Sequence, residues 1–165
     1  MKQKKVTIVE VGPRDGLQSE PEILPTASKI KYISQAIAAG ITRLEVASFV
    51  NPKKVPQMAD SEQLLAELPM PDAVSYIGLL MNERGLDRAL QTSVHEIGMV
   101  VVATDTYNMR NQGVPTRESV DVWLRIAERA KANGKAANVM ISSAFGCPYE
   151  GEVAIEHVVE IAKRV

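Results

Sequence analysis

An arginine and an aspartate stand side by side in residues 9–18, which read VEVGPRDGLQ. Successive side chains on a strand point to opposite faces, so two adjacent charges converge only where a loop replaces the strand. The proline and the two glycines of this stretch predict such a loop. A loop carboxylate such as Asp15 suits a hard divalent cation. The planar guanidinium of Arg14 suits a substrate carboxylate or a polarised carbonyl.

Each of these residues also has a purely structural interpretation. Asp15 could cap a turn or pair with a neighbour, as loop aspartates commonly do. Arg14 could form a salt bridge with Asp15 or with Glu10. Gln18 both donates and accepts hydrogen bonds, so it could orient either charged group or lie solvated in the loop. The residue types alone leave both interpretations open.

A second acidic residue, Glu45, lies inside the apolar run at residues 44–47. An ionised carboxylate buried in a strand is costly unless it is paired or lies near a metal. Its structural alternative is an internal ion pair with Arg14 or Arg43. Ser48 follows the same run, where its hydroxyl could reach a site at the end of the strand.

Other reactive side chains are weaker candidates. Cys147 has no histidine near it in sequence, and we expect it to pack a loop rather than act as a nucleophile. His95 precedes a strand, at the end opposite to catalysis in α/β folds, and His157 lies on a helix. Residues 108–111 read as a polar loop. The sequence has neither a Gly-rich phosphate loop after the first strand nor a Gly-x-Ser-x-Gly motif.

The elements that must position these residues alternate along the chain. Runs rich in β-branched residues predict strands at 6–11, 43–47, 73–79, 97–103 and 138–142. Periodic apolar residues predict helices at 26–40, 116–134 and from 155 onward, with weaker patterns at 58–67 and 83–92. This order predicts one α/β domain, residues 1–165, built from about five β-α units around a parallel sheet. A five-stranded doubly wound sheet and part of a (β/α)8 barrel both fit.

Composition restricts the partners and the compartment. The chain has 165 residues and a net charge of −1, which gives no reason to expect nucleic acid or an anionic membrane. No apolar run is long enough to span a bilayer. Residues 1–5 leave no room for a signal peptide before the first expected strand. A single cysteine forms no internal disulfide, so we expect a reducing compartment, the cytoplasm.

Three blocks of sequence resemble the hydroxymethylglutaryl-CoA lyase family. They are residues 9–18, residues 45–58 and residues 146–151, which read GCPYEG, and the resemblance extends over essentially the whole chain. The Arg-Asp-Gly-x-Gln core alone also occurs in related metal-dependent synthases and aldolases. The resemblance implies a (β/α)8 TIM barrel of which this chain supplies about five units, and a Mg²⁺ or Mn²⁺ ion in its mouth. It also implies cleavage of 3-hydroxy-3-methylglutaryl-CoA to acetyl-CoA and acetoacetate, a step of leucine degradation.

The resemblance assigns a role to each residue singled out above. Asp15 is implied to bind the metal, and Glu45 to orient a metal-bound water. Arg14 is implied to stabilise the oxyanion of the reaction and to contact the acyl-CoA substrate. Gln18 and Ser48 are implied to line the substrate pocket.

The sequence also departs from the family pattern. Lys54 replaces a tryptophan, Met140 a tyrosine and Ser143 a cysteine of the family, which leaves a related 3-hydroxyacyl-CoA open as the substrate. Family members continue for about three more units, which carry a His-x-His pair, an asparagine and the catalytic cysteine. We therefore predict negligible lyase activity for the 165-residue chain alone.

Two other interpretations stay open. The chain could be a non-catalytic half-barrel module that acts only by assembly with another chain, since the edges of an unclosed barrel invite pairing. A homo-oligomer is one form of such assembly. The chain could also be a flavodoxin-like domain, in which sequential strands are not all neighbours. Strand order distinguishes this last fold from an arc of a barrel.

Overall fold

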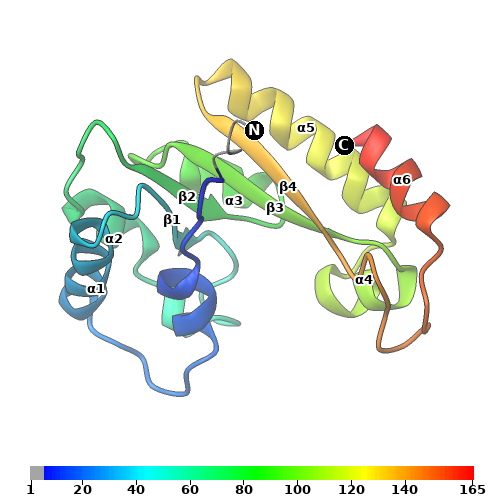
Figure 1. Ribbon diagram of the computed structural model, residues 1–165, viewed down its shortest axis with the longest axis horizontal. Helices are drawn as coiled ribbons and strands as arrows, with labels where there is room; N and C mark the ends of the chain where they lie inside the picture. The colour runs from blue at the N-terminus through cyan, green and yellow to red at the C-terminus, as the bar shows by residue number, and fades with distance from the viewer. Residues whose placement is uncertain (1–5) are drawn as a thin grey trace, which may run out of the picture.

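A computed structural model of the chain describes residues 6–165, and a parallel sheet of four strands lies at its centre (Figure 1). The strands are β1 (Arg43–Ser48), β2 (Ser75–Leu79), β3 (Glu96–Val102) and β4 (Ala136–Ser142). The α-helices are α1 (Thr26–Ala38), α2 (Ser61–Glu67), α3 (Glu83–Ala89), α4 (Asp105–Gln112), α5 (Thr116–Ala132) and α6 (Ile155–Arg164). Two short elements, η1 (Gly12–Gly16, a π-helix) and η2 (Pro56–Met58, a 3₁₀ helix), complete the set.

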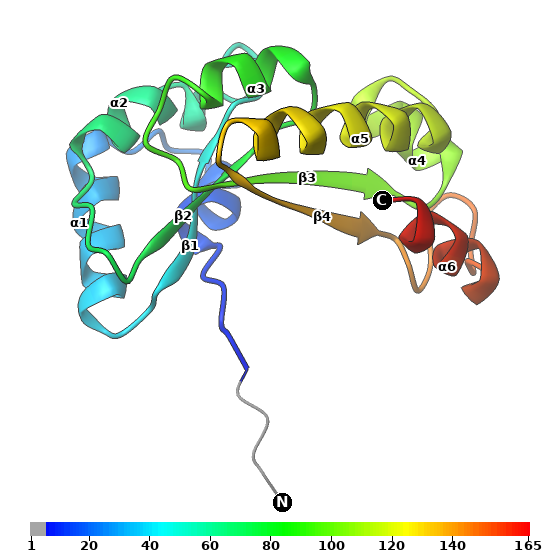
Figure 2. The same cartoon turned by 90° about the horizontal axis from the view of Figure 1, so that it is seen from above.

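The core lies between the sheet and the helices that cover one of its faces (Figure 2). In β3, the alternate residues Ile97, Met99 and Val101 are fully buried in this core. Helix α5 meets them with a stripe of residues spaced three and four apart, including Val120 and Trp123. The period of two in the strand and of about 3.6 in the helix brings these apolar faces together. The other face of the sheet is therefore left to the residues of the candidate site.

Strand order decides between the two sheet architectures. The order is β1-β2-β3-β4, and each neighbouring pair is parallel, so successive strands are always adjacent. A flavodoxin-like sheet would place non-consecutive strands side by side. The curved sheet with helices on its outer face is therefore an incomplete (β/α)8 barrel, as the sequence predicts. No helix among residues 6–165 has the length and hydropathy needed to cross a membrane.

The prediction of a first strand at residues 6–11 is wrong. Only Glu10 pairs, in a parallel bridge with Leu44. Its N–H donates to Arg43 O at 3.0 Å, and its carbonyl accepts from Glu45 N at 2.8 Å. The side chains of Val6 and Ile8 are 85% and 67% exposed. The segment thus takes the first place beside β1, but its apolar residues have no layer to bury them and the chain turns into η1 directly.

The polar loop expected at residues 108–111 is also wrong, because this stretch lies within α4. Asn108 is fully buried there. Its Oδ1 accepts from Val102 N at 3.2 Å, and its Nδ2 donates to Val114 O at 2.8 Å. Helix α4 ends at Gly113 in the left-handed conformation, with a φ of 81°. Its polar side chains satisfy backbone groups of β3 and of the segment that leads into α5, which a periodicity search for apolar residues does not detect.

Candidate functional site

Strand register determines which residues of β1 face the concave side of the sheet. Glu45 pairs with Ile77, but the next pair is Ala47 with Gly78, because a β-bulge interrupts the register between residues 45 and 47. A bulge places one extra residue in a strand and shifts the alternation of side chains. Ser48 consequently shares a face with Leu79, which lines the cavity described below. The bulge therefore puts both Glu45 and Ser48 on the concave side.

The π-helix η1 brings Arg14 over the end of β1. It begins two residues after Glu10, whose Oε1 accepts a hydrogen bond from Gly12 N at 2.6 Å. A Cβ atom at residue 12 would lie 2.4 Å from Tyr32 Oη and 2.8 Å from Glu10 Oε1. A larger residue at position 12 would therefore displace the ends of the Tyr32 and Glu10 side chains. This close packing positions the backbone that leads into Arg14.

Arg14 lies between two carboxylates. It is 6% exposed, and its Nε and Nη2 both contact Glu45 Oε1. Its Nη1 donates to Asp15 Oδ1 at 2.7 Å, while the side chain of Asp15 is 62% exposed. The sequence interpretations that paired Arg14 with Asp15 and with Glu45 hold, whereas Glu10 hydrogen-bonds the backbone instead. A guanidinium held on two sides has a fixed direction.

The electrostatics of the group are dominated by burial. Burial raises the pKa of Glu45 above its usual range, although Arg14 acts in the opposite direction. The charges of Asp15 and Glu96 raise the pKa of Glu45 further. The ion pair with Arg14 therefore offsets only part of the cost of burying Glu45.

A cavity of about 450 Å³ opens beside this group at the carboxyl ends of the strands. Its walls are Val11, Arg14, Asp15, Gln18, Leu79, Met81, Val100, Val102, Tyr107, Asn111, Met140, Ile141 and Ser142. Arg14, Asp15 and Gln18 thus meet at one wall, as the sequence predicts. Glu45 and Ser48 lie outside the wall, and Glu45 contacts it through Arg14. Sequence reasoning missed Met81 and Tyr107, because nothing in the sequence distinguishes them from other apolar and aromatic residues.

Two buried polar atoms near this wall have no hydrogen-bond partner among the described residues. They are Gln18 Oε1 and Ser48 Oγ. Buried polar atoms are almost always satisfied, so such atoms call for an explanation. A ligand or a bound water at the mouth of the arc would supply the missing partners.

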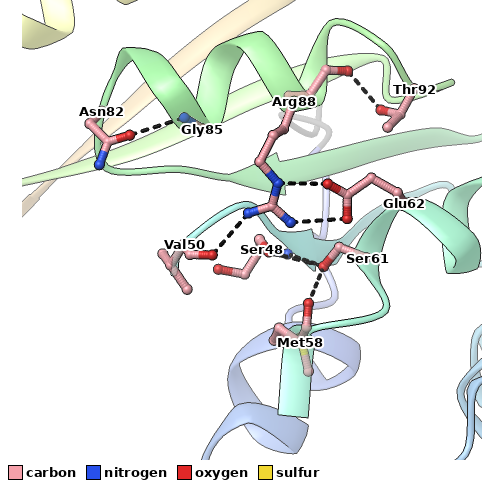
Figure 3. A network of polar contacts seen from close by, with 10 residues as sticks. Ser48, Val50, Met58, Ser61, Glu62, Asn82, Gly85, Arg88 and Thr92 are labelled. Carbon is pink, nitrogen blue, oxygen red and sulfur yellow. Dashed lines mark hydrogen bonds and ion pairs between the residues drawn. The ribbon is translucent and has the colours of Figure 1, made fainter. Parts of the chain in front are cut away.

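A network of polar contacts holds the end of β1 in place (Figure 3). Ser61 Oγ accepts from Ser48 N at 3.1 Å and donates toward Ser48 O at 3.0 Å. Nearby, Arg88 Nε donates to Glu62 Oε1 at 2.6 Å, and its Nη1 donates to Val50 O at 3.0 Å. These contacts fix the backbone of Ser48 from the helix side, which leaves its hydroxyl free to serve the concave side.

A second ion pair lies on the concave face near the amino ends of the strands. Arg43 Nε donates to Glu96 Oε2 at 2.9 Å, and Asn138 Nδ2 donates to Glu96 Oε1 at 2.6 Å. Arg43 is therefore the partner of Glu96 rather than of Glu45. Sequence reasoning missed Glu96, although it carried the same signal as Glu45, a charge beside an apolar strand.

The remaining reactive side chains serve the structure. Cys147 is buried, and its Sγ accepts from Thr104 Oγ1 at 3.0 Å. Burial by itself would raise the pKa of this thiol, but hydrogen bonds from Thr104 and from the backbone outweigh it and lower the pKa. His95 Nδ1 accepts from Tyr76 N at 3.0 Å, and His157 Nε2 lies 2.7 Å from Ala103 O. Among residues 6–165, no three His, Cys, Asp or Glu side chains gather in a way that could hold a metal ion.

Comparison with known families identifies this arrangement. The model of the HMGL-like family matches residues 5–165. The chain belongs to the HMGL-like family. It is 37% identical over 160 residues to a hydroxymethylglutaryl-CoA lyase of Bacillus subtilis, and this match covers 97% of the chain and 54% of the relative. It is 38% identical over 168 residues to an (R)-citramalyl-CoA lyase of Chloroflexus aurantiacus, covering 96% of the chain and 53% of that relative.

Solved structures show the same likeness. The crystal structure of the B. subtilis HMG-CoA lyase superposes with a TM-score of 0.94 at 37% identity, covering 98% of this chain and 54% of that chain. An HMG-CoA lyase from Acinetobacter baumannii, in complex with coenzyme A and 3-methylmalate, gives a TM-score of 0.90 at 32% identity over 96% of this chain and 52% of that one. The chain spans about half the length of the curated relatives it matches.

Proposed function

We propose that this chain forms the substrate-binding part of a carbon–carbon lyase that acts on 3-hydroxy-3-methylglutaryl-CoA or a related 3-hydroxyacyl-CoA. The proposal depends chiefly on Arg14, a buried guanidinium held at the mouth of the arc by Glu45 and Asp15. The family of the chain and its lyase relatives support the same reaction class. In that reaction the 3-hydroxyl loses its proton and becomes a carbonyl, while the broken C–C bond leaves its electron pair on the thioester as an enolate.

Arg14 is the group of this chain suited to that charge. A guanidinium carries five N–H donors, and the contacts with Glu45 and Asp15 use Nε, one N–H on Nη2 and one on Nη1. Two donors remain for an oxyanion. Donors that are already oriented stabilise a developing charge without reorganising during the reaction. We assign Arg14 to oxyanion stabilisation and to contact with the substrate, and Glu45 to holding its direction.

Asp15 is the residue we propose for a divalent cation. Its exposed side chain contacts Arg14 only through Oδ1, and Mg²⁺ commonly binds through one or two carboxylates together with water and substrate oxygens. A bound Mg²⁺ or Mn²⁺ would supply Lewis-acid polarisation of the substrate oxygen. Gln18 lines the same cavity, and its unpartnered Oε1 fits a pocket that accepts further polar atoms of a hydrated ion or substrate.

A chimaera tests this proposal. In it, residues 1–165 replace the matching part of the B. subtilis relative, so that the rest of that lyase completes the barrel. We expect Mg²⁺-dependent formation of acetoacetate from 3-hydroxy-3-methylglutaryl-CoA. Arg14→Lys is expected to keep the charge but lose the two-sided geometry, with a lower kcat. A folded chimaera that cleaves none of the 3-hydroxyacyl-CoA thioesters would contradict the proposed function.

The 165-residue chain alone is expected to have negligible activity, and turnover near that of the B. subtilis relative would overturn this expectation. The alternative, a non-catalytic module that acts by assembly, has two observations in its favour. Strand β4 is at the edge of the four-stranded sheet, and Ile155 on α6 is 75% exposed. Analytical ultracentrifugation of the chain distinguishes the two: association favours assembly, and a monomer at all concentrations opposes it. A cytoplasmic location, a homo-oligomer and a role in leucine degradation stay predictions.

A further inference from the structure

A segment at residues 55–60 leads from the loop after β1 into α2, and it contains η2. It overlaps the second of the sequence blocks described above but is not part of the cavity wall. A lysine of α1 contacts it, because Lys29 Nζ donates to Gln57 O at 2.5 Å and to Asp60 Oδ1 at 2.6 Å. Thr26 Oγ1, at the start of α1, donates to Asp60 Oδ2 at 2.7 Å. Three polar contacts therefore hold the 55–60 segment against α1.

Lys29 is buried to an unusual degree for a lysine. Its side chain is 2% exposed, whereas lysines generally bury the aliphatic stem and keep the ammonium in water. Removing the pair of Lys29 and Asp60 from water is costly, so apolar residues of similar size could stabilise the same contact equally well. Hydrogen bonds to two acceptors, however, set a direction that apolar contacts do not set. The pair is thus better suited to fixing the position of the 55–60 segment than to adding stability.

Two further contacts connect the 55–60 segment with the candidate site. Ser61 directly follows the segment, and its Oγ accepts from Ser48 N at 3.1 Å (Figure 3). On the other side, Gln57 Nε2 donates to Glu20 O at 2.8 Å, two residues after Gln18. Gln18 and Ser48 carry the two buried polar atoms that have no partner among residues 6–165. One segment therefore holds the backbone next to both of these side chains.

We propose that Lys29 and Asp60 are positioning residues for the substrate pocket and act through the 55–60 segment on Gln18 and Ser48. The inference rests on the proposed function, because the pocket has a substrate to bind only if the cavity accepts an acyl-CoA. Lys29 is not part of the cavity wall, so it acts on the pocket through the segment alone. Without the pair, η2 is free to shift, and the two polar side chains lose their fixed place.

Hydrogen exchange in the 165-residue chain tests the structural half of this inference. The double variant Lys29→Met/Asp60→Asn removes both charges, so no unpaired charge stays buried and the chain is expected to fold. We expect the Ser48 amide to exchange about tenfold faster, because Ser61, its acceptor, is no longer held in place. Amides in the centre of β3 should keep the rate of the parent chain. Exchange followed by NMR measures both, and a general loss of stability would accelerate both.

The chimaera tests the functional half. The double variant is expected to raise KM for 3-hydroxy-3-methylglutaryl-CoA about tenfold, the effect of losing one hydrogen bond, while kcat stays within about threefold. Partial unfolding would instead lower kcat at unchanged KM, because fewer molecules would be active. Lys135→Met is the matched control, because Lys135 Nζ donates to Val94 O at 2.6 Å near the amino end of β3. It should change neither KM nor the exchange of Ser48.

A milder variant keeps the test independent of folding. Gln57 is half-buried, and Gln57→Met removes only the side-chain contact with Glu20 O. We expect KM to rise about threefold, the lower end of the range for one hydrogen bond. An unchanged KM would overturn the role of the 55–60 segment.

The other outcomes separate this inference from the proposed function. Unchanged exchange of the Ser48 amide in the double variant would overturn the positioning role and leave the proposed function standing. Faster exchange with an unchanged KM would overturn it as well, because the segment would then have no effect on the pocket. A parent chimaera that cleaves no 3-hydroxyacyl-CoA would overturn the proposed function and the effect on substrate together, whereas the exchange of Ser48 would still show whether Lys29 holds the end of β1.

Discussion

Two arginine–glutamate pairs lie on the concave face of the same sheet, and they differ in what surrounds them. Arg14 lines the cavity at the carboxyl ends of the strands and pairs with Glu45 in the middle of β1, beside the exposed Asp15 and the unpartnered Gln18 Oε1. Arg43 and Glu96 lie toward the amino ends, where Asn138 donates to the remaining carboxylate oxygen.

The difference shows that a charge in a strand does not by itself mark a site. Both glutamates are buried, at 4% exposure for Glu45 and 6% for Glu96. Glu96 has a protein donor for each of its oxygens, so its pair is a closed network. Around Arg14, in contrast, two of its N–H groups and Gln18 Oε1 have no partner among residues 6–165, and both residues line a cavity. Unused hydrogen-bonding capacity at the carboxyl end of the strands is what distinguishes the candidate site from the structural pair.

Replacing the arginine of each pair should give the largest difference in stability between the two pairs. Arg14→Met removes the only side-chain donor that Glu45 has among residues 6–165, so we expect a loss of about 3–5 kcal/mol in the free energy of unfolding. Arg43→Met leaves Glu96 with Asn138, and the side chain of Arg43 is 33% exposed, so we expect about 1–2 kcal/mol. Urea denaturation measures both. Equal losses would mean that the two pairs are equivalent.

Two glycines of the loop that carries Arg14 should differ in how much stability is lost when alanine replaces them. Gly12→Ala displaces Tyr32 Oη and Glu10 Oε1, which accepts a hydrogen bond from residue 12, so we expect a loss of about 0.5–1.5 kcal/mol in stability. Gly16→Ala is the matched control, because nothing lies within 4 Å of its added methyl group. It should change stability by less than about 1 kcal/mol. Thermal unfolding of the two variants tests whether close packing at residue 12 positions the site.

The pH dependence of stability should report on Glu45. Its raised pKa means that the folded state holds its proton more tightly than the unfolded state does. The stabilising contribution of the protonated group is therefore complete at low pH and is lost as the pH rises through the folded-state pKa. We expect the stability of the parent chain relative to Glu45→Gln to decrease over that interval. A relative stability that increases with pH would show that Arg14 outweighs burial.

Asp15→Asn should have the smallest effect on folding. The side chain is 62% exposed, so its ion pair with Arg14 contributes little, and the free energy of unfolding should change by less than about 0.5 kcal/mol. In the chimaera, the same substitution should raise the Mg²⁺ concentration needed for activity. A stability loss above 2 kcal/mol would show that Asp15 is chiefly structural.

The sequence predicted the fold correctly where the same patterns recur along the chain, namely apolar strands followed by periodic helices. Apolar β3 and the periodic α5 were evident, and the alternation of such units indicated a parallel sheet. It failed at residues 6–11, because an apolar run predicts a strand only where another layer covers it. It failed at α4 because Asn108 is buried by hydrogen bonds to the backbone, which hydropathy does not register.

The site was predictable in part for a similar reason. Arg14, Asp15 and Gln18 are adjacent in sequence and share a loop, so their convergence could be anticipated. Ser48 was correctly placed at the end of β1, but the bulge that turns it to the concave side is visible only in the register of the strands. Met81 and Met140 meet only in three dimensions, and neither carries a chemical signal of its own.

The central claim is that Arg14 supplies the donors for the developing oxyanion. The most direct measurement is kcat of the chimaera with Arg14→Ala, with and without added guanidinium ion. The account predicts that kcat falls by about 10²- to 10³-fold, the range for loss of one oxyanion donor, and that guanidinium restores part of it. A folded variant whose kcat stays within twofold of the parent would contradict the account.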